Sequence, residues 1–429
     1  MNLLLAQSEV PDLPTVGLSQ VIAPYMFVFF FAFFITFAVT PLMRLLAVRN
    51  GIVDWPDLKR KNHLQPVAYL GGVAIFIGWL GGVALCYFYR PEAGGLSNAD
   101  LRAMVSIILG AGAITLAGLL DDVYHISPRV KVGGQLIAAA AIASQDVGIR
   151  LVESAFGVLN IDIFPDPVIY TLGTIVVAVF VIGGCNAINL LDGLDGLAVG
   201  VSTIATSGFL LIAAIIAVRA HGVESENVAS LLGDPLRIVM CIAILGALLG
   251  FLPYNFNPAT IFMGDAGSQL LGYLCVTTIL IFSDVPQKGL LLVTACLIVF
   301  SVPITDTCLA IFRRKIAGRS ILAADDQHIH HILRRSGLSV RTSVLVLYAI
   351  AIVFAVLGCT MVWFDIRWRY MLAVFVVLYG FIMVSAYKYG LINVMLNAQT
   401  DDRIDSTSDR KVGGSAVHQD TGGEASQLK

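Results

Sequence analysis

The sequence predicts an all-α, polytopic integral membrane protein. Of its 429 residues, 57% are hydrophobic and 13% are charged, and the mean hydropathy is +0.84. Soluble domains carry roughly 25% charged residues. Here, apolar runs of about 20 residues, the length that crosses a bilayer core, recur along nearly the whole chain. Because backbone groups in lipid must hydrogen-bond within their own segment, these runs are expected to be helices.

About eleven transmembrane helices are expected from the apolar runs. They cover residues 21–46, 69–89, 103–120, 132–145, 168–185, 197–218, 235–252, 268–283, 289–312, 343–363 and 370–392. An odd number of spans places the two termini on opposite sides of the membrane. If the N-terminus is periplasmic, the cytoplasmic segments hold 19 of the 27 Lys and Arg residues. The positive-inside rule therefore predicts a periplasmic N-terminus and a cytoplasmic C-terminus.

Composition divides the chain into three parts. Residues 1–20 are expected to be a periplasmic segment, without the basic stretch and long apolar run of a secretory signal. Residues 21–392 form the transmembrane domain, and the polar residues 393–429 are expected to be a disordered cytoplasmic tail. Gly148–Phe164 alternates partly and is rich in Val, Ile and Phe, which predicts a short periplasmic β-hairpin. The seven cysteines lie in apolar runs, which predicts small buried side chains.

The most unusual polar residues lie in the stretch Asn186–Gly196, between two apolar runs. Asn186, Asn189, Asp192 and Asp195 recur there at every third position. Residues three apart are neighbours on a helix surface. Carboxylates this close to hydrocarbon are costly, which makes a functional site the default interpretation. The alternative is an ordinary solvated loop between two helices.

Other acidic residues are predicted to lie on the same side of the membrane. Asp121 and Asp122 end the third span, where acids oppose the helix dipole and therefore carry a cost. Their alternative role is a solvated helix end. Asp265 lies between two glycines just before the eighth span, and its alternative role is an N-cap.

Basic residues and histidines complete this predicted face. The cytoplasmic loops contain Lys59, Arg60, Lys61 and His63, then Arg313, Arg314 and Arg319, then His328, His330 and His331. The first cluster is alternatively a membrane-surface anchor. Zinc at the histidines is disfavoured, because no thiolate pair or zincin motif accompanies them.

These residue types predict a site for a divalent cation and phosphates. Carboxylates and amides are hard oxygen ligands suited to Mg²⁺, or Mn²⁺ in its place, and Mg²⁺ typically binds one or two carboxylates plus substrate phosphates. Arginine, lysine and histidine suit phosphate oxygens. Metal-binding and phosphate-binding residues at one membrane face predict phosphoryl transfer between a soluble phosphate donor and a lipid acceptor. No Walker-type phosphate loop occurs, which disfavours a P-loop ATPase, and no pattern indicates a nucleic-acid partner.

Residues 40–341 resemble the polyprenyl-phosphate N-acetylhexosamine-1-phosphate transferases. The four matching motifs are Gly-Leu-Leu-Asp121-Asp122, Asn186-Ala-Ile-Asn189-Leu-Leu-Asp192-Gly-Leu-Asp195-Gly, Asn255 with Phe262-Met-Gly-Asp265-Ala-Gly-Ser, and His328-Ile-His330-His331. The histidine motif is similar to that of the branch that acts on UDP-N-acetylglucosamine and undecaprenyl phosphate. The peptidoglycan branch usually has three consecutive histidines, whereas Ile329 separates the first histidine from the pair here.

The resemblance implies roles for the matching residues. Asp265 would be the principal Mg²⁺ ligand, with Asn189 helping and Asp122 supporting the metal or the lipid phosphate. Asp121 would deprotonate or orient that phosphate, which Lys61, with Arg60 or His63, would also meet. Asp195, Asn255 and the ring of Phe262 would hold the uridine, with Asn186 and Asp192 supporting the pocket. His328, His330 and His331, with Arg313, Arg314 or Arg319, would hold the diphosphate and the amino sugar.

The reaction implied is transfer of N-acetylglucosamine 1-phosphate from UDP-N-acetylglucosamine to undecaprenyl phosphate, releasing UMP. It would occur at the cytoplasmic face of a bacterial inner membrane and begin a lipid-linked surface polysaccharide such as O-antigen. The resemblance also suggests a homodimer. One alternative is the same reaction with another UDP-N-acetylhexosamine or with UDP-N-acetylmuramoyl-pentapeptide.

Two alternatives come from other protein classes. The CDP-alcohol phosphotransferases need Asp-Gly-x-x-Ala-Arg, which neither Asp192-Gly193 nor Asp195-Gly196 begins. A cation-coupled transporter would be expected to have acids near the bilayer midplane and repeated halves. Asp306, inside the ninth span, is the one acid that fits this second pattern, and the sequence assigns it no role.

Overall fold

The computed structural model describes residues 17–55, 66–88, 96–159, 161, 163–220, 235–285, 287–316, 328–381 and 384. The chain divides into two compact units, Met1–Phe375 and Val376–Lys429. The described part of the first unit is helical except for its turns and one short two-stranded ladder. The prediction of an all-α membrane protein is therefore confirmed.

Eight helices in the described residues are long and apolar enough to cross a membrane. They are the continuous run α1 (Leu18–Ile22), η1 (Ala23–Tyr25) and α2 (Met26–Arg49), then α3 (Gly71–Phe88), α4 (Asn98–Tyr124), α7 (Asp166–Leu191), α8 (Leu197–Ala220), α10 (Pro235–Asn255), α11 (Gly264–Ile281) and α15 (Val340–Trp363). The shorter helices are α5 (Pro128–Ala143), α6 (Arg150–Leu159), η2 (Phe282–Asp284), α12 (Gly289–Val299), α13 (Ser301–Ile316) and α14 (Ile329–Arg335), and Trp368–Phe381 forms a further apolar helix. The total of eleven crossings and the orientation stay predictions.

The β-hairpin predicted for Gly148–Phe164 is wrong, because this segment contains helix α6. Leu151, Ala155 and Leu159 recur every four residues, which is the spacing of one helix face rather than of a strand. The strands lie elsewhere. β1 (Val53–Asp54) pairs antiparallel with β2 (Val67–Ala68).

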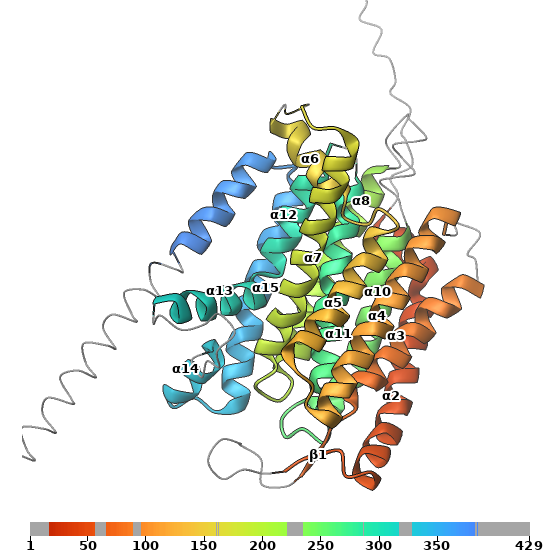
Figure 1. Ribbon diagram of the computed structural model, residues 1–429, viewed down its shortest axis with the longest axis vertical. Coiled ribbons are helices and arrows are strands. Elements are labelled where there is room, and N and C mark those ends of the chain that lie inside the picture. Colours follow the sequence, from red (N-terminus) through yellow and green to blue (C-terminus); the bar gives the residue numbers. More distant parts are fainter. Residues whose placement is uncertain are drawn as a thin grey trace, which may run out of the picture. The chain divides into compact units, whose positions relative to one another are not determined.

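The expected ninth span, 289–312, is broken into α12 and α13, which are bent by 76°. Pro303 lies in the first turn of α13, and proline has no N–H to donate to a carbonyl of the preceding helix. A new helix can start there because its first turn needs no such bond. As a result, α13 lies across the direction of the neighbouring long helices (Figure 1).

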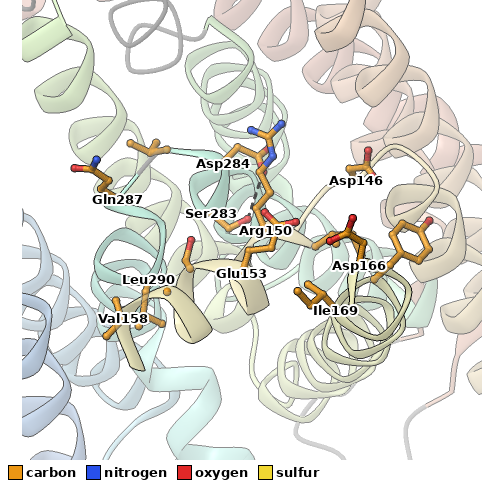
Figure 2. Close-up of a pocket in the computed structure, with 15 residues that line it drawn as sticks. Asp146, Arg150, Glu153, Val158, Asp166, Ile169, Ser283, Asp284, Gln287 and Leu290 are labelled. Carbon is orange, nitrogen blue, oxygen red and sulfur yellow. Dashed lines mark hydrogen bonds between the residues drawn. The ribbon is translucent and has the colours of Figure 1, made fainter. Parts of the chain in front are cut away.

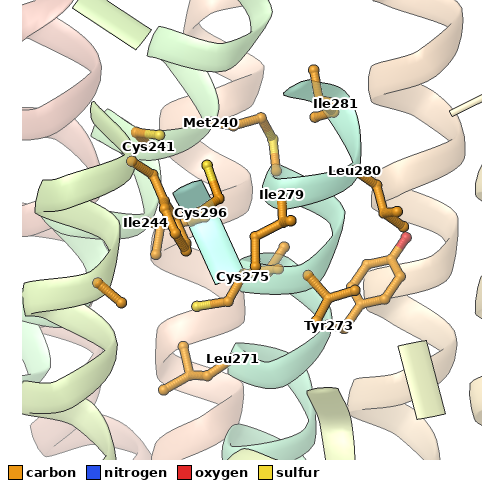
Figure 3. Close-up of a cluster of buried hydrophobic side chains, with 14 of the residues drawn as sticks. Met240, Cys241, Ile244, Leu271, Tyr273, Cys275, Ile279, Leu280, Ile281 and Cys296 are labelled. Carbon is orange, nitrogen blue, oxygen red and sulfur yellow. The ribbon is translucent and has the colours of Figure 1, made fainter. Parts of the chain in front are cut away.

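Helix α11 is the centre of the bundle, since its whole spanning window is buried. Figure 3 shows its apolar face, where Cys275 and Ile279 lie beside Cys241 of α10 and Cys296 of α12. All seven cysteines are free thiols, and all but Cys308 are buried, as predicted. Glycines let neighbouring helices approach α11 closely. A Cβ on Gly272 of α11 would lie 2.2 Å from the carbonyl oxygen of Gly184 on α7.

This packing brings the last turns of α4 and α7 and the first turn of α11 to the same end of the bundle. The strand β1 and helix α14 lie towards that end, and α6 lies at the opposite end (Figure 1). Asp121 and Asp122, Asn189, and Asp265 lie on these three helix ends. The fold therefore places them together.

Candidate active site

A cleft of about 420 Å³ opens where α4, α7 and α11 meet. Its lining residues include Asp121, Asp122, Asn189, Asp192, Asp195, Asn255, Phe262, Asp265 and His331, all of which are predicted site residues. Asp54, Tyr69, His125 and Asn257, which were not predicted, also line it. The structure thus brings three sequence motifs and part of the fourth to one cavity.

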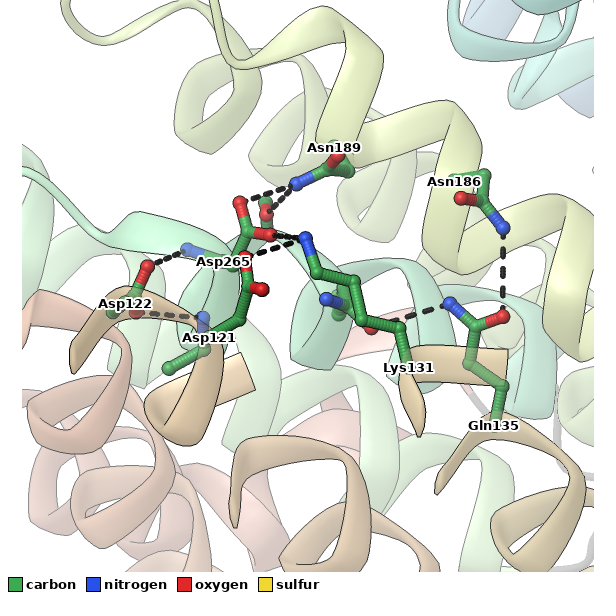
Figure 4. Close-up of polar contacts among 10 residues, drawn as sticks. Asp121, Asp122, Lys131, Gln135, Asn186, Asn189 and Asp265 are labelled. Atoms are coloured by element: carbon green, nitrogen blue, oxygen red, sulfur yellow. Dashed lines mark hydrogen bonds and ion pairs between the residues drawn. The ribbon is translucent and has the colours of Figure 1, made fainter. Parts of the chain in front are cut away.

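The carboxylates of Asp121 and Asp265 face one another across a lysine (Figure 4). The Nζ atom of Lys131, in the first turn of α5, lies 2.5 Å from Oδ2 of Asp121 and also donates to Oδ2 of Asp265. Lys131 is not among the site residues predicted from the sequence. The signal was present, because it is a lysine that directly precedes an apolar run and lies ten residues after Asp121.

Asn189, in the last turn of α7, supports Asp265 from the other side. Its Nδ2 donates to Oδ1 of Asp265 at 2.8 Å and to Oγ of Ser268 at 2.9 Å. Asn186, one turn earlier, points away from the cleft towards Gln135 (Figure 4). It donates to the Ile182 carbonyl of its own helix at 2.7 Å. Of the two asparagines, only Asn189 therefore lines the cleft.

Asp122 joins the end of α4 to the start of α11. Its carboxylate oxygens accept hydrogen bonds from the backbone N–H groups of Asp265, at 2.7 Å, and Ala266, at 3.1 Å. The alternative role of Asp265 as an N-cap is wrong, because Met263 is the N-cap residue and Asp122 satisfies the exposed N–H groups. The approach of Asp122 to the start of α11 requires a glycine at position 264. Gly264 has φ +67°, and a Cβ there would lie 2.5 Å from Oδ2 of Asp122. The metal role of Asp122 stays a prediction.

The turn between α7 and α8 is tied to the loop after α10 by two predicted nucleotide-binding residues. Oδ2 of Asp195 accepts from Nδ2 of Asn257, at 2.9 Å, and from the Ala259 N–H, at 3.0 Å. Asn255 accepts from the Gly196 N–H at 3.2 Å. Its Nδ2 donates to the Ile261 carbonyl at 3.1 Å. Both side chains therefore fix the shape of the cleft wall.

Asp192 is a half-buried acid in this turn. Burial and the neighbouring carboxylates of Asp265, Asp122 and Asp195 raise the pKa of Asp192 well above its ordinary value. This environment favours the protonated carboxyl group, which can donate a hydrogen bond. Phe262 also lines the cleft, and its ring centroid lies 6.1 Å from that of Tyr69.

The three histidines lie at the start of α14 in different environments. His331 lines the cleft, and its ring centroid is 4.2 Å from that of His330. His330 is buried against Gly193, where a Cβ would lie 2.2 Å from its Nε2. Within the described residues, neither nitrogen of His330 has a hydrogen-bond partner. Burial and the adjacent His331 lower the pKa of His330 to about 4.

The low pKa of His330 predicts that α14 loosens in acid. The pKa of His330 in the folded protein lies below the ordinary value. The free energy that His330 contributes to holding α14 in place is therefore complete above about pH 6.5 and is lost as pH falls towards 4. At pH 5 the loss is about 2 kcal/mol. Hydrogen exchange of α14 peptides, corrected for intrinsic rate, should therefore speed up between pH 7 and pH 5. The same acceleration in His330→Gln would contradict this explanation.

The basic residues predicted for the phosphates are less fully placed. Arg313 and Arg314 lie in the last turn of α13, half-buried and outside the set that lines the cleft. Arg319, Arg60, Lys61 and His63 lie outside the described residues. Their roles stay predictions.

The donor set fits a divalent cation of the Mg²⁺ type. The described residues contain no ready cluster of three or more metal-binding side chains. However, Asp121 and Asp265 already share one cationic group, the Lys131 ammonium, and Asn189 adds an amide. Mg²⁺ needs only one or two carboxylates when substrate phosphates and water complete its shell.

Figure 2 shows a larger cavity, of about 940 Å³. It is lined by residues of α6, which lies at the opposite end of the first unit (Figure 1). Its charged groups are Arg150 and Glu153 of α6, together with Asp146, Asp166 and Asp284. No predicted site residue lines it. The smaller cleft is therefore the candidate active site.

Comparison with known proteins agrees with this assignment. Residues 104–283 match the family described as Glycosyl transferase family 4. The chain is 34% identical to the "Probable undecaprenyl-phosphate N-acetylglucosaminyl 1-phosphate transferase" of Bacillus subtilis (strain 168), over 83% of this chain and 89% of the relative. The chain belongs to glycosyl transferase family 4.

Other relatives of this family-4 enzyme cover similar lengths. The "Decaprenyl-phosphate N-acetylglucosaminephosphotransferase" of Mycolicibacterium smegmatis is 33% identical over 77% of this chain and 80% of the relative. The "Undecaprenyl-phosphate alpha-N-acetylglucosaminyl 1-phosphate transferase" of Yersinia pestis is 26% identical over 85% and 91%. The resemblance identified from the four motifs is confirmed.

Proposed function

We propose that this family-4 enzyme transfers N-acetylglucosamine 1-phosphate from UDP-N-acetylglucosamine to undecaprenyl phosphate. The products are undecaprenyl-diphosphate-N-acetylglucosamine and UMP. One observation carries the proposal. Asp121 and Asp265 share the Lys131 ammonium group at a bundle end, beside the Asn186–Gly196 motif, in a chain similar over most of its length to relatives named for this reaction.

In the proposed reaction, a phosphate oxygen of the lipid attacks the sugar-bearing phosphorus. The bond from that phosphorus to the oxygen bridging it to the α-phosphate breaks, and UMP leaves with that oxygen. Asp265 and Asp121, with help from Asn189, would hold Mg²⁺, which would supply neutralisation of charge on the diphosphate. Asp122 holds Asp265 in place through the start of α11.

For Asp121 the ion pair with Lys131 supports an orienting role. A phosphate monoester with a second pKa near 6 is already largely ionised at neutral pH, so the acceptor needs orientation more than proton removal. Lys131 and Asp121 would therefore align the lipid phosphate. Lys61 and His63 would meet it from the first cytoplasmic loop.

The donor would lie along the opposite wall of the cleft. Phe262 would stack on the uracil, and Asp195 and Asn255 would keep the wall in the shape that accepts it. Asp192, in its protonated form, would donate to an acceptor oxygen of the nucleotide. His331, with His328, His330 and the arginines of α13 and the following loop, would meet the diphosphate and the amino sugar.

The surroundings of the reaction belong to the same proposal. The enzyme would be a multi-pass protein of a bacterial inner membrane, and the distribution of Lys and Arg supports an active site on its cytoplasmic face. A homodimer is the proposed assembly. The lipid product would begin a surface polysaccharide.

The test compares sugar donors in one assay. The purified full chain in detergent, with undecaprenyl phosphate, should move sugar label from UDP-N-acetylglucosamine into the organic phase, and EDTA should stop this. UDP-N-acetylmuramoyl-pentapeptide and other UDP-N-acetylhexosamines should be poorer donors. No metal-dependent lipid product would reject the proposal, and a faster rate with another donor would change the substrate.

A further inference from the structure

Asp306 of α13 is a fully buried acid that the proposed chemistry does not use. Both of its oxygens are engaged, and both partners lie in the histidine motif. Oδ2 is 2.9 Å from Nδ1 of His328, and Oδ1 accepts from the Ile329 N–H at 2.9 Å. Burying a carboxyl group is costly unless it is hydrogen-bonded. Asp306 therefore compensates its burial by holding the start of α14.

The contact with Ile329 replaces an ordinary helix cap. His328 is the N-cap residue of α14, but its side chain makes no capping hydrogen bond. The exposed N–H of Ile329 is instead satisfied by Asp306, from a different helix. This arrangement leaves the His328 ring available for another role, with only Nδ1 bound to the acid.

Ring contacts connect this acid to the cleft. The rings of His328 and His330 are nearly parallel, with centroids 5.7 Å apart. His330 packs on Gly193 of the α7–α8 turn and on His331, which lines the cleft. A shift of the His328 ring would therefore move His330 and, through it, affect Gly193 and His331. The bend between α12 and α13 allows this contact, because it turns α13 away from the direction of α12.

We propose that Asp306 is a positioning residue of the transfer reaction, which fixes the ring and tautomer of His328 and docks α14 on the cleft. This inference rests on the proposed function. A carboxylate on Nδ1 requires a hydrogen on that nitrogen, so that Nε2 of neutral His328 is the acceptor. Nε2 is then the His328 nitrogen that can accept a hydrogen bond or take up a proton.

The decisive variant is Asp306→Asn, which keeps the size of the side chain. Its amide oxygen can still accept from Ile329, but its NH₂ group presents hydrogens to Nδ1 and so selects the other tautomer of His328. We expect kcat to fall roughly 10- to 100-fold, as for other partners that orient functional histidines. The donor KM should stay within about threefold. Thr307→Ala is the matched control, because the Thr307 hydroxyl donates to Pro303 of its own helix.

The tautomer provides a readout that packing alone would not change. ¹⁵N-histidine spectra of the full chain, with the His328 signal assigned from His328→Gln, should show a hydrogen on Nδ1 in the wild type and none on Nδ1 in Asp306→Asn. A wild-type His328 without that hydrogen would overturn the proposal, even if the variant does not fold. Normal transfer by Asp306→Asn would overturn the role of Asp306 alone. Absence of transfer by the wild type would instead overturn the proposed function.

Discussion

Asp265→Asn should lower the transfer rate by about a thousand-fold or more, while the protein stays folded. The substitution removes one of the two carboxylates that face each other across Lys131. It keeps the backbone N–H that Asp122 accepts from, so the start of α11 should remain capped. Removing one electrostatic partner from a preorganised site commonly costs 10²–10³-fold in rate, and this group also binds the proposed cation.

The measurement is the initial rate of lipid-product formation, together with Mn²⁺ titration followed by electron paramagnetic resonance. Mn²⁺ affinity should fall at least about tenfold in Asp265→Asn, since hard carboxylate ligands dominate such sites. Asp166→Asn, at the opposite end of α7 from Asn189, is the control and should match the wild type. Full activity of Asp265→Asn would show that the cation is not held where we propose.

Gly118→Ala should impair both stability and transfer, because α4 approaches the backbone of α11 closely at Gly118. A Cβ there would lie 2.4 Å from Cα of Ala266 and 2.6 Å from the carbonyl oxygen of Asp265. These are backbone atoms and cannot rotate away, so the two helices must separate. We expect a loss of about 1–3 kcal/mol in the free energy of unfolding. Displacing Asp121 and Asp122 by about 1 Å should also reduce transfer on the order of 100-fold.

Gly112→Ala is the matched control for this prediction. It lies on the same helix, and its Cβ would meet only Phe76 at 3.9 Å, an ordinary contact. Thermal unfolding in detergent and the transfer rate should both be close to wild type for Gly112→Ala and lowered for Gly118→Ala. Equal behaviour of the two variants would mean that the α4–α11 approach does not set the site geometry.

The fold class and most of the cleft could be predicted because membrane helices and misplaced acids both leave local signals. Asp121, Asp192 and Asp265 each interrupt or border an apolar run, and burial of such groups is too costly to be accidental. Helix α6 was mistaken for a hairpin because its short amphipathic pattern also contains β-branched residues. In so short a segment, the spacing of apolar residues did not distinguish the repeat of a helix from the alternation of a strand.

The contact of Lys131 with Asp265 and that of Asp306 with His328 could not be assigned from the sequence, because each joins different helices. Lys131 pairs with Asp265, 134 residues away, and Asp306 pairs with His328 across a bend that no local pattern positions. The capping of α11 by Asp122 is a similar case. A capping residue normally lies just before its own helix in the sequence, whereas Asp122 belongs to α4. These contacts depend on how α4, α5, α11 and α13 are packed, and only the structure supplies that packing.

The central claim is that the phosphorus next to the sugar moves to the lipid with the sugar. UDP-N-acetylglucosamine labelled with ³²P in its β-phosphate, incubated with the purified full chain, Mg²⁺ and undecaprenyl phosphate, tests this directly. The account predicts ³²P in the organic-extractable lipid and unlabelled UMP in the aqueous phase. Label that stays in aqueous UDP while the sugar moves to lipid would show simple glycosyl transfer and would contradict the account.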